Sequence, residues 1–459
     1  MFKALIILWR KRIVGSLAPK ECILSYGKNI LKRSIIFVFL IILVVIGCSR
    51  REEIDQQEKV LIRWAGYTSV DYNPFRIKKS REFEKLYPHV RVRYEPVGGH
   101  YAGKILTQIA GKVAPDIFFV DDLHLYVQKG ALVDLTEKVE ADKEFFNEIN
   151  PKLIDAHRWK GKIYALPGNY GLRGILFYNK KIFDEEGIDY PDETWTWQDL
   201  LETAKRLTKK DSDGRIVRFG YVDQIAGGML FYIYQNGGRL WNEERSKCII
   251  NTLESQQAMN FWDSFHTKYH VSPPPSAYKE MQTARDIFIM GRAAMYGGNS
   301  WDIRVFKYHK KMKNYEVAFF PVPEKGKKRF AAWSCISFGI WSGSKHPEIA
   351  YEFAKFMITP GWIKTLVELS DSLPLRKEGE AMEAFLNLPG VSQNTKEVLL
   401  DTAEISQNWN QLLYHPNLSH MELNHLIAQE MDKFNLGLSS AEETLREIQN
   451  KLNKRISGD

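Results

Sequence analysis

The chain has 459 residues, with 64 Lys and Arg against 56 Asp and Glu, and a formal net charge of +8. Residues 1–47 hold eight of the basic residues and one of the acidic ones, so the remaining 412 residues carry 56 basic and 55 acidic groups. This balance excludes the broad positive field on which nucleic-acid binding depends. A segment of 412 residues is longer than one hydrophobic core usually serves, so we expect two lobes.

The first 47 residues predict a secretory signal. Residues 35–47 carry no charge and lie between Lys32-Arg33-Ser34 and Cys48. These thirteen residues would span about 20 Å as a helix, less than the roughly 30 Å of a hydrocarbon core. Val45-Ile46-Gly47-Cys48 resembles the bacterial lipobox, which implies that Cys48 is lipidated and begins an extracytoplasmic protein held at a membrane through a tether, residues 48–59. The alternative is a signal anchor with an incidental cysteine.

The first half of the remaining chain alternates predicted strands and helices. Strands are expected at 60–64, 90–94 and 115–120, and helices at 77–86 and 105–109. Trp64 lies inside the first strand and is expected in the core. Strand, helix and strand in this order predict a βαβ pattern and a largely parallel sheet.

The second half continues the α/β pattern. Strands at 163–167 and 175–178 flank Gly168-Asn169-Tyr170-Gly171, and an amphipathic helix at 197–207 begins with the capping residue Thr196. Further strands or helix ends are expected at 288–295, 317–320 and 336–341, and amphipathic helices at 350–357 and 441–452. Cys248 and Cys335 either form one disulfide or remain two buried thiols.

The sequence holds no recognisable catalytic or metal motif. Neighbouring carboxylates such as Asp121-Asp122 or Asp184-Glu185-Glu186 do not make a glycosidase pair, because such groups must face each other across a site. Asp211-Ser212-Asp213-Gly214 is similar to half of a calcium loop but lacks the closing glutamate, so a hairpin turn is favoured. We therefore expect no enzyme activity, no cofactor and no metal.

Several segments together resemble the extracellular solute-binding proteins of ABC importers, the family that includes maltose-binding protein. The resemblance is carried, in chain order, by Phe83-Glu84-Lys85-Leu86-Tyr87-Pro88, Ala114-Pro115-Asp116-Ile117-Phe118, Gly161-Lys162-Ile163-Tyr164-Ala165-Leu166-Pro167, Phe177-Tyr178-Asn179-Lys180, Phe288-Ile289-Met290-Gly291-Arg292-Ala293 and Pro374-Leu375-Arg376.

That resemblance implies an α/β fold of the two-lobe periplasmic-binding-protein type (type II), with the ligand in a cleft between lobes joined by crossover hinges. By similarity the N-terminal lobe is 55–169 plus 337–378, and the C-terminal lobe is 170–336 plus 379–459. The implied function is capture of a mono- or oligosaccharide and its delivery to the membrane subunits of a permease. A monomer is expected, outside the cytoplasm.

Sugar binding needs aromatic faces and fixed hydrogen-bonding groups, and several residues near strand ends and crossovers offer them. By resemblance and position the candidates are Trp301, Tyr67, Thr68, Asp121, Asp122, Tyr170, Asn299, Trp333 and Arg376. Each has a structural alternative: aromatic residues also pack hinges, Asp after a strand often caps a helix, and Arg376 could form a surface ion pair.

The subsite pattern of the maltose-binding members is not reproduced, because His425 and Val120 stand where those members have stacking tryptophans. This puts maltose in doubt but not carbohydrate. The same fold can also hold glycerol phosphodiesters, oligopeptides or polyamines, or present a ligand to a sensor. Arg376 is the single obvious cleft cation in the sequence, which favours a neutral sugar.

Overall fold

The computed structural model describes residues 59–68, 73–224, 228–274, 277, 283–309 and 312–458. The predicted signal (1–47), Cys48 and most of the predicted tether lie outside the described residues. By its contacts the chain divides into two units. Val60 and His89–Arg91 belong to the first, where the Val60 amide donates to the His89 carbonyl. The second, Leu61–Pro88 with Val92–Asp459, contains both cavities and every side chain discussed below.

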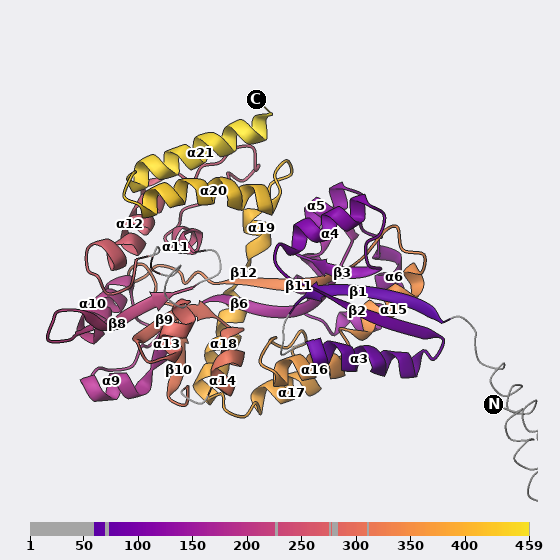
Figure 1. The fold of residues 1–459 in the computed structure, drawn as a ribbon, viewed down its shortest axis with the longest axis horizontal. Helices are drawn as coiled ribbons and strands as arrows, with labels where there is room; N and C mark the ends of the chain where they lie inside the picture. The colour runs from indigo at the N-terminus through magenta and orange to yellow at the C-terminus, as the bar shows by residue number, and fades with distance from the viewer. Residues whose placement is uncertain are drawn as a thin grey trace, which may run out of the picture. The chain divides into compact units, whose positions relative to one another are not determined.

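The structure alternates strands and helices along the chain (Figure 1). The elements up to the long strand β6 are β1 (Val60–Tyr67), α3 (Asn73–Leu86), β2 (Val90–Val97), α4 (Tyr101–Ala110), β3 (Ile117–Val120), α5 (Leu123–Gln128), α6 (Thr136–Ala141), α7 (Lys143–Asn147), α8 (Pro151–Asp155), β4 (Arg158–Trp159), β5 (Lys162–Ile163) and β6 (Leu166–Asn179).

The elements from α9 to β11 are α9 (Lys180–Glu186), α10 (Trp197–Leu207), β7 (Lys209–Lys210), β8 (Ile216–Asp223), α11 (Met229–Gln235), α12 (Leu253–Thr267), α13 (Ala284–Ile289), β9 (Ala293–Asn299), α14 (Asp302–Tyr308), β10 (Tyr315–Phe319) and β11 (Ala332–Ile340). The last elements are α15 (Pro347–Phe356), α16 (Pro360–Glu368), α17 (Glu380–Leu386), α18 (Gln393–Ile405), β12 (Gln407–Asn408), α19 (Trp409–Leu413), α20 (His420–Asn435) and α21 (Ala441–Ser457).

One sheet runs through the molecule, in the order β2-β1-β3-β11-β6-β9-β8-β7. The predicted βαβ pattern is confirmed, because β1 pairs with β3 in parallel, with Trp64 opposite Ile117. The expectation of a largely parallel sheet is wrong for the centre, where β11 runs antiparallel to both β3 and β6, and β6 antiparallel to β9. A βαβ unit fixes the direction of its own strands only, and β6 and β11 are not joined by one.

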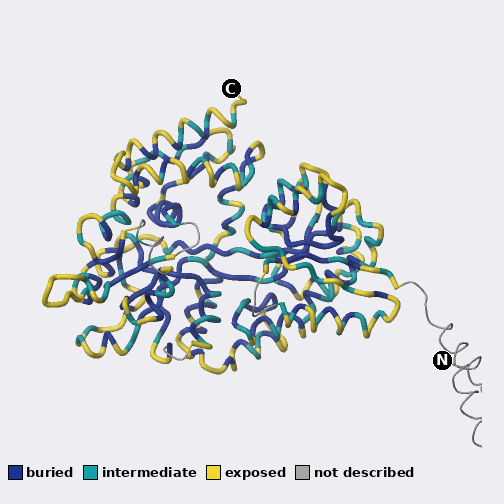
Figure 2. Tube along the Cα trace, in the orientation of Figure 1, coloured by how far each residue is buried: buried dark blue, intermediate teal, exposed yellow. Residues whose placement is uncertain are grey.

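The central strands are longer than the sequence suggested. Residues 168–171 were expected to separate two strands, but β6 runs unbroken from Leu166 to Asn179. Glycine is needed at Gly168, because a Cβ there would lie 2.4 Å from the Ile336 carbonyl oxygen of β11. Gly168 thus marks a close approach of two strands, and such an approach requires glycine inside a strand just as a tight loop can require it. Buried residues run along both β6 and β11 (Figure 2).

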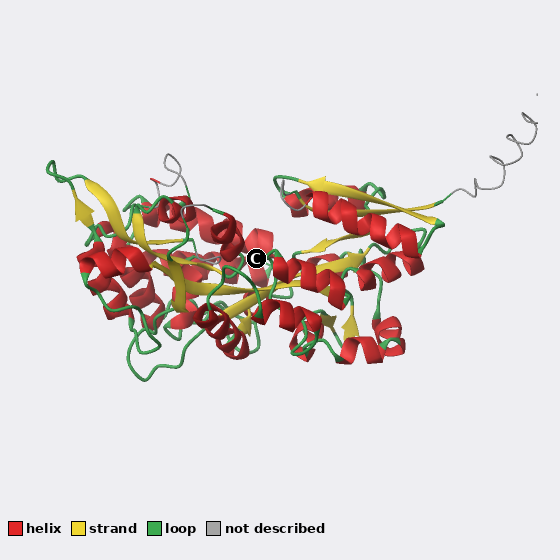
Figure 3. Ribbon diagram, turned by 90° about the horizontal axis from the view of Figure 1, so that it is seen from below, coloured by secondary structure: helices red, strands yellow, loops and turns green. Residues whose placement is uncertain are grey.

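Helices cover both sides of the sheet (Figure 3), and two apolar cores hold them. Near β1, the Trp64 ring lies edge-on to Phe353 at 5.9 Å between centroids, which confirms the core position predicted for Trp64. Near β8 and β9 the core includes Phe231 and Trp197. Trp197 opens α10 behind the Thr196 capping box, so that predicted helix start is confirmed.

Two remaining expectations concern cysteines and membrane spans. Cys248 and Cys335 are both buried and both free, so the two-thiol alternative is the correct one. None of the helices in the described part of the chain has the length and apolarity to cross a bilayer.

Candidate functional site

A cavity of about 370 Å³ lies where β6 and β11 run side by side. Its volume falls at the lower end of the range typical of small-molecule sites, about 300–1,000 Å³. It is lined by Tyr67, Arg76, Asn169, Gly171, Arg173, Trp301, Arg304, Ser334, Ile336 and Asp371.

The floor of this cavity is one face of the two central strands. Side chains of a strand alternate between faces, so Asn169, Gly171 and Arg173 of β6 point the same way. Their antiparallel partners on β11 include Ser334, opposite Gly171, and Ile336, opposite Asn169. The pattern of alternate residues thus gathers polar groups from both strands on one surface.

Trp301 forms an aromatic wall above this floor. It lies in the turn between β9 and α14, next to Ser300, whose amide donates to the Leu172 carbonyl (3.0 Å) and whose Oγ accepts from the Leu172 amide (2.9 Å). The ring packs on the bare backbone of Gly171, where a Cβ would lie 2.8 Å from Trp301 Cε3. Trp301 remains partly exposed, which leaves ring surface for a ligand.

Tyr67 and Arg76 also line the cavity. Tyr67 is the last residue of β1, and its ring packs against Tyr101 and Phe119 at centroid distances of 4.4 and 5.7 Å. Burial, with the nearby charge of Asp121, raises the pKa of the Tyr67 hydroxyl, which stays a neutral donor and acceptor. Arg76 is buried and donates to the Tyr67 carbonyl.

A polar group at the cavity edge joins three distant segments. Asn169 Nδ2 donates to Asp371 Oδ2 at 3.3 Å, and its Oδ1 accepts from the Ile336 amide at 3.2 Å. Arg304 of α14 forms an ion pair with the same aspartate, with Nε 3.9 Å from Asp371 Oδ1. Asp371 is therefore already engaged by groups of the protein.

Arg173 contacts two indole rings. The centre of its guanidinium is 5.7 Å from the Trp301 ring and 5.5 Å from the Trp409 ring, both within cation–π range. Burial lowers the pKa of Arg173 to about 10, so the group remains a cation at neutral pH.

Tyr170 and Trp333, both predicted for the site, lie on the other face of the same two strands. They alternate with the floor residues and form a T-shaped pair at 5.7 Å between ring centroids. The Lys152 Nζ stands 5.5 Å from the Tyr170 ring and 5.9 Å from the Trp333 ring. The structure therefore separates these two aromatics from the cavity that holds Trp301.

The two aspartates after β3 have local partners. Asp122 caps α5 by accepting from the Leu125 amide at 3.2 Å, and it also accepts from the His420 amide at 2.9 Å. Asp121 accepts from the Tyr126 hydroxyl at 3.1 Å, and burial raises the pKa of its carboxyl group. Asp122 thus has the capping role that was the structural alternative, while Asp121 lies near enough to Tyr67 to act on its pKa.

The other three predicted residues are not in the cavity lining. Thr68 is exposed just beyond β1. Asn299 is buried at the end of β9, where its amide donates to Asp302 Oδ2 at 2.9 Å. Arg376 is buried and pairs with Glu148 at 3.1 Å, away from the floor strands. Of the nine predicted residues, the structure therefore brings Tyr67 and Trp301 to this cavity.

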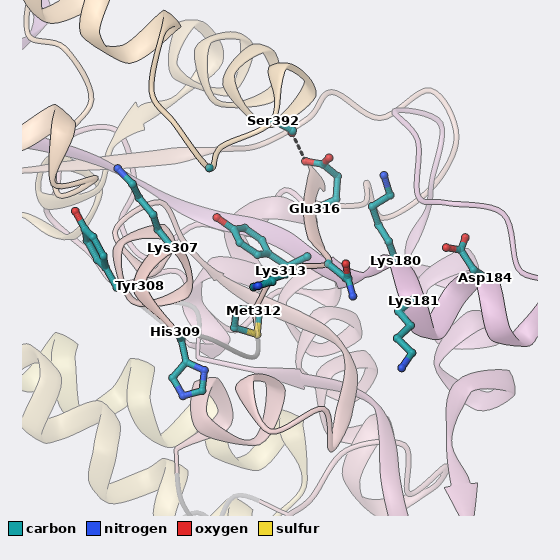
Figure 4. Close-up of a pocket in the computed structure, with 13 residues that line it drawn as sticks. Lys180, Lys181, Asp184, Lys307, Tyr308, His309, Met312, Lys313, Glu316 and Ser392 are labelled. Carbon is teal, nitrogen blue, oxygen red and sulfur yellow. Dashed lines mark hydrogen bonds between the residues drawn. The ribbon is translucent and has the colours of Figure 1, made fainter.

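A second cavity, about 830 Å³, lies among α9, α14 and the start of β10 (Figure 4). Its lining includes Lys180, Lys181, Lys307 and Lys313. Figure 4 shows their ammonium groups pointing in different directions rather than toward one point. Lys307 Nζ donates to the Glu368 carbonyl. A set of diverging cations gives no fixed geometry for a ligand, so the cavity at β6 and β11 is the better candidate.

The possible metal loop is a turn in the structure. Asp211 Oδ1 accepts from the amides of Asp213 (3.0 Å) and Arg215 (2.9 Å), at the hairpin that joins β7 to β8. This confirms the hairpin alternative. Within the described ranges, no group of three or more metal-binding side chains comes together.

Comparison with known proteins adds a family and a fold. A sequence model of the bacterial extracellular solute-binding proteins matches residues 69–364. An uncharacterized ABC transporter extracellular-binding protein of Pyrococcus horikoshii is 24% identical over 66% of this chain and 68% of its own length. A galactooligosaccharide-binding protein of Bacillus subtilis is 23% identical over 61% of this chain and 63% of its own length, slightly less than two thirds.

Solved structures match almost the whole described chain. An ABC substrate-binding protein of Listeria monocytogenes in complex with cycloalternan has a TM-score of 0.76 at 24% identity, and covers 87% of this chain and 100% of its own. A maltose-bound protein of T. maritima has a TM-score of 0.72 at 21% identity, and covers 86% of this chain and 99% of its own. At these identities the structural likeness concerns the fold.

Proposed function

Because the chain belongs to the family of bacterial extracellular solute-binding proteins, we propose that it is the substrate-binding subunit of an ABC importer and captures a carbohydrate. Members of this family are carriers outside the cytoplasm rather than enzymes, and their fold has two lobes, as the sequence predicted. The carbohydrate class is supported by relatives such as the galactooligosaccharide-binding protein.

The observation that carries the proposal is the wall of Trp301 above a polar floor. A sugar ring has an apolar face, which stacks on an aromatic ring, and hydroxyls around its edge, which need fixed hydrogen-bond partners. Trp301 offers the first, and Asn169 and Ser334 lie on the floor to offer the second. The arginines of the lining disfavour a polyamine, because like charges repel in a partly buried cavity.

The floor strands also suggest how binding is coupled to motion. We place the lobe boundaries at 55–169 plus 337–378 and 170–336 plus 379–459, so that β6 and β11 both cross between lobes. A ligand that touches both strands and Trp301 contacts the two lobes at once. Closure then follows from the higher affinity of the closed state, and the closed form docks on the permease.

A thermal-shift screen tests the carbohydrate assignment. The soluble protein, beginning after Cys48, is heated with glucose, galactose, xylose, their common disaccharides and their uronic acids, beside spermidine and a mixed tripeptide. We expect at least one saccharide to raise the melting temperature, since a ligand that binds only the native state stabilises it. A shift with spermidine or the peptide and with no saccharide would overturn the assignment.

The leader supports a lipid anchor at Cys48. The tether would keep the binding protein near its permease and raise its effective concentration there. We expect wild-type protein expressed in a bacterial host to incorporate labelled palmitate and to sediment with membranes. Cys48→Ala should abolish both while leaving saccharide affinity unchanged. Membrane retention of Cys48→Ala would favour the signal-anchor alternative.

A further inference from the structure

The half-buried guanidinium of Arg173 has no anionic partner in the described part of the chain. Its Nε is shielded from solvent and makes no hydrogen bond, and within the described part of the chain its guanidinium forms no ion pair. The contacts that hold it are the faces of Trp301 and Trp409. A cation–π contact uses no N–H···O hydrogen bond, so the N–H groups of the guanidinium remain available as donors.

Ring stacking alone does not explain a cation at this position. Arg173 is half-buried, and a cation that loses part of its hydration is stabilised best when it is paired and hydrogen-bonded; the two aromatic rings supply neither a full opposite charge nor a carboxylate or carbonyl acceptor. The low pKa of Arg173 reflects burial with no compensating carboxylate. A neutral side chain of similar length would pack beside the two indoles at a lower desolvation cost, so packing alone does not account for the charge.

The surrounding charges leave Arg173 open to an anion from outside. The described lining contains three arginines, Arg76, Arg173 and Arg304, and one acidic residue, Asp371, for a formal balance of +2. Asp371 pairs with Arg304 and accepts from Asn169. No carboxylate of the lining is therefore left to pair with Arg173.

From this arrangement we propose that the ligand is an acidic saccharide, whose carboxylate pairs with Arg173 while a sugar ring lies against Trp301. The inference rests on the proposed carbohydrate function and narrows its ligand class. The planar fork of a guanidinium matches a carboxylate with two parallel hydrogen bonds. A carboxylate also suits the site better than a doubly charged phosphate monoester does, because Arg76 and Arg304 already have partners in the described chain and a second charge would find no unpaired cation beside Arg173.

The test uses matched saccharides on the wild-type protein. Calorimetric titrations compare D-galacturonic acid with D-galactose and digalacturonic acid with galactobiose, and likewise D-glucuronic acid with D-glucose. We expect an acidic member to bind about tenfold to a hundredfold more tightly than its neutral partner, as for hydrogen bonds to a charged group. The advantage should shrink at high salt, because the cavity opens to solvent.

Variants then assign the effect to Arg173. Arg173→Gln keeps most of the side-chain length without the charge, and it should remove the advantage of the acidic saccharide while changing neutral-sugar affinity less than about threefold. Arg173→Lys, which keeps the charge without the fork, should retain part of the advantage. Arg446→Gln, which removes an exposed cation of α21, is the matched control and should bind as wild type does.

The possible outcomes distinguish a failure of the acidic-ligand inference from a failure of the proposed carbohydrate function. Equal binding of acidic and neutral partners, or tight binding of neutral ones alone, overturns the acidic-ligand inference and leaves the carbohydrate function standing. An acidic preference that survives in Arg173→Gln overturns the assignment to Arg173. Tight binding of sn-glycerol 3-phosphate or glycerophosphocholine, with no saccharide bound, overturns both the inference and the carbohydrate function.

Discussion

Because Gly171 and Trp301 are in close contact, one methyl group added at position 171 tests whether the position of the Trp301 ring controls ligand binding. An alanine Cβ at position 171 would lie 2.8 Å from Trp301 Cε3 and 3.2 Å from Cζ3. Ordinary contact begins near 3.4 Å, so the ring must move by about 0.6 Å. A ring displaced by this distance from its best contact with a ligand loses about a quarter to a half of the dispersion attraction.

That loss of attraction determines how much ligand affinity the variant should lose. Removal of the whole ring in Trp301→Ala should cost about 2–3 kcal/mol of binding free energy, from stacking and apolar contact together. Gly171→Ala should then cost about 1 kcal/mol, or roughly a fivefold loss. Gly171→Ala should also lose about 1 kcal/mol of stability, because the overpacking strain of about 1–3 kcal/mol exceeds the roughly 0.4–1 kcal/mol that comes from the lower entropy of the unfolded alanine chain.

The assay is a calorimetric titration with the best saccharide of the thermal-shift screen, beside a melting curve for each variant. Gly111→Ala is the matched control, because Gly111 has a helical backbone (φ −77°, ψ −1°) and its added Cβ would come no closer than 3.4 Å to any atom. Wild-type affinity in both Gly171→Ala and Trp301→Ala would refute the role of Trp301 as the sugar platform. Wild-type affinity in Gly171→Ala alone would refute the claim that Gly171 positions the ring.

Two further predictions concern stability and pH. His157 is buried between Leu153 and Ser337, and burial lowers its pKa to about 4 from 6.5. The unfolded chain therefore takes up a proton first as pH falls, so stability should drop by about 3 kcal/mol between pH 6.5 and pH 4. In urea unfolding, His157→Gln should flatten this slope, and an unchanged slope would contradict the prediction. Glu430 is buried beside two lysines, and the hydrogen bond from Lys451 is the main cause that lowers its pKa. Its stabilisation is present above the unfolded pKa near 4.5 and is lost as pH falls through the lower folded value, so Glu430→Gln should cost about 1 kcal/mol at pH 7 and less at pH 3. A similar loss at both pH values would show that packing, not charge, is responsible.

Local signals predicted the separate elements well and the long strands poorly. The Thr196 capping box defines the start of α10 because its hydrogen bonds form within four residues. By contrast, β6 is continuous because its backbone packs against β11, more than 150 residues away in the chain. The glycines at 168 and 171 are equally compatible with a loop until that neighbour is known.

The choice of single residues for the candidate site shows the same limit of prediction from local sequence. Tyr170 and Trp333 were chosen for their place at the crossovers, yet the cavity lies on the face of Asn169, Gly171 and Ser334. A shift of one residue along a strand moves a side chain to the opposite face. Both faces of β6 are largely buried, so hydropathy gives no sign of which face carries the ligand.

The positive charge of the site could not be predicted from the sequence for a related reason. Arg76, Arg173 and Arg304 are separated by about a hundred residues each and belong to β6 and two helices, so no run of basic residues announces them. A near-neutral composition excludes a broad positive field, but it does not constrain three cations that the fold gathers in one cavity. Arg376, which stood out in the sequence, is neutralised by Glu148, whereas Arg173 has no such partner in the described chain. The preference for a neutral sugar rested on the arginines that stand out in the sequence, whereas the acidic saccharide proposed above rests on the contacts of Arg173, and the paired titrations decide between the two.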